Sequence, residues 1–145
     1  MDTPTKTTFR LLILAEILLR IGDGVADHFG ESSLPEALRN FPYENWYDGA
    51  SKTVLVTMAG CLALLVLGQI GAYVGLLLFW RPARALYLAL VVGEILFTSF
   101  FSSFYVGPAL SFGLAEASRV VAGVILALVY WSPVKALFER PVVAA

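Results

Sequence analysis

Four charged residues interrupt the apolar stretch at residues 8–30. Glu16, Arg20, Asp23 and Asp27 follow one another at steps of four, three and four. On a helix, that spacing places them on one face. A charged face turned toward lipid would be very costly, so these side chains are expected to face protein or trapped water.

Later apolar stretches also contain charges. At a helical rise of about 1.5 Å per residue, Arg20, Glu94 and Arg119 reach similar depths in a membrane. The sequence therefore predicts an ionic centre shared by three helices, with Arg20 pairing with Glu94, and Arg119 pairing with Glu116 or Asp23. Its predicted members are Glu16, Arg20, Asp23, Glu94, Glu116 and Arg119.

Such a centre could have either of two roles. Buried ion pairs would fix the register of the helices, and removing one partner would cost several kcal/mol. Alternatively, the same residues could line a path for protons or small solutes, because charged residues inside a membrane are functional candidates by default. Since carboxylates outnumber arginines in the centre, one acid is expected to be protonated or open to the outer water. We take the structural role as the primary hypothesis and transport as the alternative.

The composition is that of a membrane protein. Of the 145 residues, 59% are hydrophobic and 14% charged, and the mean hydropathy is +0.79, whereas soluble domains average about a quarter charged residues. The net charge of −1 argues against nucleic acid as a partner. Cys61 is the only cysteine, so no disulfide can form within the chain.

The chain contains no motif that predicts catalysis or a cofactor. Asp27 and His28 are adjacent in sequence, and adjacent residues point in different directions on a helix, so they do not converge on a metal ion. We expect His28 to lie in a water-exposed loop. No catalytic residue, cofactor or metal ligand is predicted.

The expected fold is all-α: one integral membrane four-helix bundle over residues 1–145. Apolar stretches predict helices at about residues 8–27, 52–80, 83–105 and 109–131, with an outer loop at 28–51. Residues 54–79 carry no charge and are long enough to span about 30 Å of hydrocarbon. Gly68, Gly71 and Gly75 are spaced for close helix packing and predict a face that docks on another helix.

The outer loop contains two further signals. Ser33 and Glu36 have capping-box spacing around Pro35, which predicts a short helix at about residues 34–41. Aromatic residues follow, and they are either interfacial anchors or part of an ordinary packed loop. They are Phe41, Tyr43, Trp46 and Tyr47.

The basic residues predict the orientation of the chain. If the helices alternate in direction, six basic residues lie on one side of the membrane, and only Arg39 and Lys52 lie on the other. By the positive-inside rule, both termini are cytoplasmic. Glu16 and Arg20 interrupt the first apolar run, so we interpret it as a retained helix and not a cleaved signal. The six are Lys6, Arg10, Arg81, Arg84, Lys135 and Arg140.

An internal repeat is also visible. Residues 79–86 and 130–137 share the pattern aromatic-Trp-x-Pro-x-basic-Ala-Leu, and residues 15–18 match residues 93–96 around Glu16 and Glu94. Both matches run in the same direction, which predicts two tandem helical hairpins related by an axis along the membrane normal.

Residues 75–84, Gly107-Pro108 and residues 123–135 resemble an uncharacterised family of small four-helix proteobacterial inner-membrane proteins. The resemblance covers roughly residues 50–140 and is weakest across the first helix. It implies the fold and a bacterial inner-membrane location, and it implies no activity. Family members often have an acidic residue where this chain has Ala122, and no arginine at the place of Arg119.

These observations predict a multi-pass inner-membrane protein that acts as a structural or partner-binding module. It would dock to a larger complex or to a second copy of itself within the lipid bilayer. The alternative is a transporter or channel subunit that uses the intramembrane charges. A membrane-embedded enzyme would need a polar cavity open to the outside near Asp27 and His28.

Overall fold

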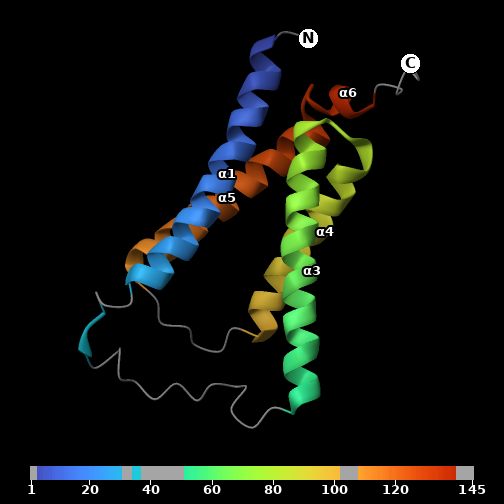
Figure 1. Ribbon diagram of the computed structural model, residues 1–145. Helices are drawn as coiled ribbons and strands as arrows, with labels where there is room; N and C mark the ends of the chain where they lie inside the picture. The colour runs from blue at the N-terminus through green and yellow to red at the C-terminus, as the bar shows by residue number, and fades with distance from the viewer. Residues whose placement is uncertain (1–2, 31–33, 37–50, 102–107, 140–145) are drawn as a thin grey trace.

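The computed structural model describes residues 3–30, 34–36, 51–101 and 108–139. Its elements are α1 (Thr3–Gly30), α3 (Lys52–Leu77), α4 (Arg81–Phe101), α5 (Ala109–Trp131) and the short α6 (Lys135–Phe138). Figure 1 shows these described segments as helices without a strand, which confirms the all-helical prediction.

Some of the helix boundaries differ from the predicted ones. α5 has the predicted bounds, whereas α1 is longer at both ends and therefore contains His28, which we expected in a loop. Pro4 is compatible with the N-terminal extension, since proline is well tolerated in a first helical turn. α6 was not predicted. The short helix and the aromatic cluster predicted in the outer loop lie outside the described residues, apart from positions 34–36.

The long helices pack as two pairs. α1 lies along α5, and α3 lies along α4, each pair antiparallel. The closely packed pairs are therefore not the two predicted hairpins, since α1 contacts α3 little and α4 contacts α5 little. The pairs meet near the end of the molecule that holds the start of α1, the α3–α4 turn and α6, and they diverge toward the other end (Figure 1). α5 turns one face inward, with buried residues at Ser111, Ser118, Ala122, Ile125 and Val129.

Aromatic rings pack together at the end of the molecule where the two helix pairs meet. The ring of Phe79 lies 5.8 Å from that of Phe9 on α1 and 5.4 Å from that of Phe138 on α6. Phe79 has a φ of 57°, the left-handed conformation that ends many helices. The amide of Trp80 donates to the carbonyl of Gly75 at 2.7 Å, which completes the turn. A position that favours glycine thus carries a phenylalanine, because its ring joins three segments.

α3 approaches α4 closely at two of its glycines. A Cβ atom added at Gly75 would lie 2.6 Å from the Cβ of Ala83, and one added at Gly68 would lie 3.1 Å from Leu90. A Cβ at Gly71 would meet nothing within 4 Å. We expected these three glycines to pack against another helix, and α4 of the same chain lies against Gly68 and Gly75.

Among the described helices, α3 and α5 are long and apolar enough to cross a membrane. None of the residues in the most apolar stretch of α3 is buried within the chain. α1 has six charged residues among its 28. The described helices therefore leave much of the apolar surface of α3 and α5 uncovered.

The glycine contacts predict different effects for two matched substitutions. We expect Gly75→Ala to destabilise the protein by about 1–3 kcal/mol, because the Cβ of Ala83 is fixed to backbone and cannot move aside. Gly71→Ala is expected to be neutral or stabilising by up to about 1 kcal/mol, since alanine favours helix. Unfolding in mild detergent measures both. Equal stability of the two variants would contradict the close approach of α3 and α4.

Candidate functional site

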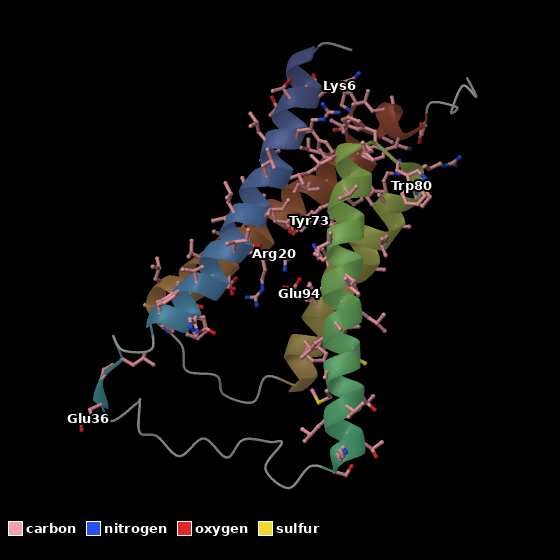
Figure 2. The ribbon with its side chains drawn as sticks, in the orientation of Figure 1. Lys6, Arg20, Glu36, Tyr73, Trp80 and Glu94 are labelled. Carbon is pink, nitrogen blue, oxygen red and sulfur yellow. The ribbon has the colours of Figure 1, made fainter. Side chains whose placement is uncertain are left out.

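Arg20 joins two carboxylates that come from different helices. Its Nε donates to Oε1 of Glu16, one turn earlier on α1, at 3.2 Å. Its Nη2 lies 2.8 Å from Oε2 of Glu94 on α4. Figure 2 shows Arg20 and Glu94 approaching each other across the space between the two helix pairs. The predicted ion pair between Arg20 and Glu94 is therefore present.

Glu16 is the buried member of this group. Its side chain is 0% exposed, and the hydroxyl of Tyr87 on α4 donates to its second oxygen, Oε2, at 2.5 Å. Tyr87 and Glu94 are seven residues apart and so lie on the same face of α4. Both oxygens of Glu16 are thus engaged, and α1 is bonded to α4 at two successive levels.

α3 contributes two polar side chains to the same region. The sequence analysis did not predict either of them. Tyr73 is 8% exposed, and its ring centroid lies 6.0 Å from that of Tyr87. Its hydroxyl and Nε2 of Gln69 are buried without a hydrogen-bond partner. Gln69 is a lone amide in an uncharged stretch, and that was the one signal in the sequence that could have marked it.

Asp23 takes part in a separate contact. Its Oδ1 accepts a hydrogen bond of 2.6 Å from the hydroxyl of Ser111 on α5. The charged face of α1 therefore divides between two neighbours, with Glu16 and Arg20 turned to α4 and Asp23 turned to α5. Asp23 helps to hold the α1–α5 pair together. It is not part of the group formed by Glu16, Arg20, Tyr87 and Glu94, which we call the Arg20 cluster.

Glu116 and Arg119 also lie apart from the predicted centre. They form an ion pair with each other along α5, and their side chains are 67% and 47% exposed. Depth in the membrane alone predicts that they join Arg20. They point outward because the opposite face of α5, which contains Ala122 and Ile125, is buried.

A cavity of about 830 Å³ opens beside the Arg20 cluster. Residues of α1, α3 and α4 line it, and ten of the fourteen lining residues are aliphatic or phenylalanine. The remaining four are Arg20, Gln69, Tyr73 and Glu94. The site is thus a mostly apolar pocket with one polar wall. Pockets that bind small molecules have this character and typically measure 300–1,000 Å³.

No family model, curated protein or solved structure matches the chain.

The bond between Tyr87 and Glu16 predicts a measurable loss on substitution. We expect Tyr87→Phe to destabilise the protein by about 1–3 kcal/mol, because it leaves one buried carboxylate oxygen without a donor. Tyr130→Phe is the matched control, since that ring stacks on Arg84 and keeps its stacking face as phenylalanine. Unfolding in detergent compares the two.

A double-mutant cycle separates this bond from general packing. In a Glu16→Gln background, we expect Tyr87→Phe to cost less, because the group left without a donor is neutral. The coupling should be about 1 kcal/mol. A Tyr87→Phe effect no larger than that of Tyr130→Phe would contradict the assignment.

Proposed function

We propose that this chain is a multi-pass protein of a bacterial inner membrane, in which α1, α3, α4 and α5 all span the bilayer, and that it is a structural, partner-binding module. The apolar surfaces of α3 and α5 support the membrane location. α1 is compatible with it because Glu16, Arg20 and Asp23 are bonded to neighbouring helices and do not face lipid.

The positions of the basic residues support an orientation with both termini in the cytoplasm. The start of α1, the α3–α4 turn and α6 lie at one end of the molecule (Figure 1). Basic residues are concentrated in these segments, as expected for a cytoplasmic side. Those in the described segments are Lys6, Arg10, Arg81, Arg84 and Lys135.

The helix pairing supports a tandem duplication. In the proposed repeat, α1 corresponds to α4 and α3 corresponds to α5, so exchanging the two halves converts the α1–α5 pair into the α4–α3 pair. Arg20 contacts Glu16 and Glu94, which occupy matching places in the two halves. Two like-charged residues related by the repeat are thus held together by one arginine.

The partner-binding role is carried by one observation, the outward position of the Glu116–Arg119 ion pair. Arg119 is ten residues from the start of α5, or about 15 Å along a helix of about 34 Å. A charged residue at the centre of a spanning helix costs about 3 kcal/mol on insertion scales. Both side chains are exposed, so contact with another protein would remove that cost.

The arrangement favours a second copy of the chain as the partner. An acid and a base of one pair, side by side on one face, complement the same face rotated by a two-fold axis. Glu116 of one copy would then face Arg119 of the other. Gly113 and Gly123 on this outer face meet nothing within 4 Å, so helices can approach there closely.

The transport alternative has less support. A relay needs a carboxylate that is able to exchange protons, whereas both oxygens of Glu16 are bonded to neighbouring side chains. We therefore keep the structural role for the Arg20 cluster and assign the docking role to α5.

Cysteine cross-linking tests the proposed dimer. In a Cys61→Ser background, we expect Gly123→Cys and Gly113→Cys to form disulfide-linked dimers in oxidised membranes, because the two-fold axis would bring each position near its equivalent. Wild-type Cys61 is exposed on α3 and serves as the control, expected to cross-link much less. Absence of cross-linking at both α5 positions would refute the α5 interface.

A charge-swap series tests the role of the ion pair in the same assay. Arg119→Glu alone should reduce Gly123→Cys cross-linking at least about fivefold, since four acids would then meet at the interface. Combining it with Glu116→Arg should restore the cross-link, because each pair is re-formed with the charges exchanged. Rescue by the double variant separates a lost interface from a failure to insert. Unchanged cross-linking in the single variant would contradict a role of the ion pair in the interface.

The orientation is testable with reporter fusions. Alkaline phosphatase fused after residue 145 should be inactive and a fluorescent protein fused there should be bright, because both termini are expected in the cytoplasm. The reverse pattern would overturn the proposed topology without affecting the helix packing.

A further inference from the structure

We propose that the cavity beside Arg20 binds a neutral acyl lipid and holds its ester carbonyl against Tyr73 and Gln69. The cavity has a volume of about 830 Å³ and lies between α1 on one side and α3 and α4 on the other. Its apolar walls suit an acyl chain. This inference rests on the proposed membrane location and is independent of the proposed dimer.

Two buried groups on α3 lack the partner that such a lipid would supply. The hydroxyl of Tyr73 and Nε2 of Gln69 are both buried and form no hydrogen bond of good distance and angle, although Gln69 and Glu16 lie near that hydroxyl. Both Tyr73 and Gln69 line the cavity. Tyr73 and Gln69 are one turn apart on α3 and so lie on the same face. Both groups can donate, and a buried donor without an acceptor costs about 1–3 kcal/mol. A carbonyl oxygen in the cavity would satisfy this need.

The charges beside these donors select against an anionic headgroup. Two carboxylates, Glu16 and Glu94, and one guanidinium, Arg20, leave a formal charge of −1 in the cluster. An anionic carboxylate or phosphate is therefore disfavoured. A cationic headgroup finds no free acceptor at Glu16, because Arg20 and Tyr87 engage both of its oxygens.

The depth of the donors points to a small headgroup. Tyr73 and Gln69 are seven and eleven residues before Trp80, which places them about 10 and 16 Å along the helix from that end. A phospholipid keeps its phosphate at the membrane surface, so its ester groups do not reach that far. A monoacylglycerol or diacylglycerol has an uncharged head and can lie deeper.

The test is a lipid titration of the purified full-length protein in mild detergent, followed by native mass spectrometry. The probes are monooleoylglycerol, which has a neutral ester, and oleate, which has the same chain and a carboxylate. We expect monooleoylglycerol to bind at least about fivefold more tightly than oleate. Equal binding, or tighter binding of oleate, would overturn the proposal.

Two variants assign the binding to the cavity. Tyr73→Phe should weaken monooleoylglycerol binding roughly two- to tenfold, the value of one hydrogen bond, and leave oleate binding less affected. Val66→Trp, at an exposed position in the cavity wall, should weaken both. Tyr130→Phe lies outside the cavity and should change neither. Unchanged ester binding in Tyr73→Phe would refute the role of its hydroxyl.

The outcome is separable from that of the dimer experiment. Lipid binding is measured on the detergent-solubilised chain, whereas the α5 interface is scored by cross-linking in membranes. Loss of ester selectivity with intact cross-linking would remove only the lipid site.

Discussion

The burial of the Glu16 carboxylate is the constraint on which the rest of the structure depends. An ionised carboxylate in an apolar interior is very costly unless its oxygens are bonded. Here Arg20 takes one oxygen and Tyr87 takes the other. Because Tyr87 and Glu94 belong to α4, satisfying Glu16 and Arg20 fixes both the depth and the rotation of α4 against α1. A purely apolar contact would leave both adjustable.

This connection explains how two separate helix pairs form one molecule. α1 packs mainly on α5, and α3 mainly on α4, so few contacts join the pairs. The Arg20 cluster joins them near mid-length, and the rings of Phe9, Phe79 and Phe138 join them at one end. Between these ties and the diverging ends there is room for the cavity. Its polar wall is therefore a consequence of the same cluster.

The outer surfaces show a different division of tasks. α3 uses Gly68 and Gly75 to approach α4, which leaves its remaining surface apolar and suited to lipid. α5 buries one face against α1 and turns Glu116 and Arg119 outward. A charged pair on an apolar helix is stable in a membrane when another protein covers it. The proposed dimer and the proposed lipid site both follow from the requirement that charges be paired. The dimer would cover the Glu116–Arg119 pair on the outside of α5, and the lipid site lies beside the internal pairs of Arg20.

The sequence alone determined the helical class, the approximate bounds of the long helices and the pairing of Arg20 with Glu94. These follow from apolar length, from turn residues such as Pro82 and Pro133, and from counting helical rise. Only the tertiary structure decided which side of each helix faces inward. Rise gives the depth of Arg119 and Glu116, but their rotation depends on how α5 packs, and this separates them from Arg20. The structure also identified Tyr87, because its hydroxyl bonds Glu16, 71 positions earlier in the chain. Tyr73 was then found through its ring contact with Tyr87.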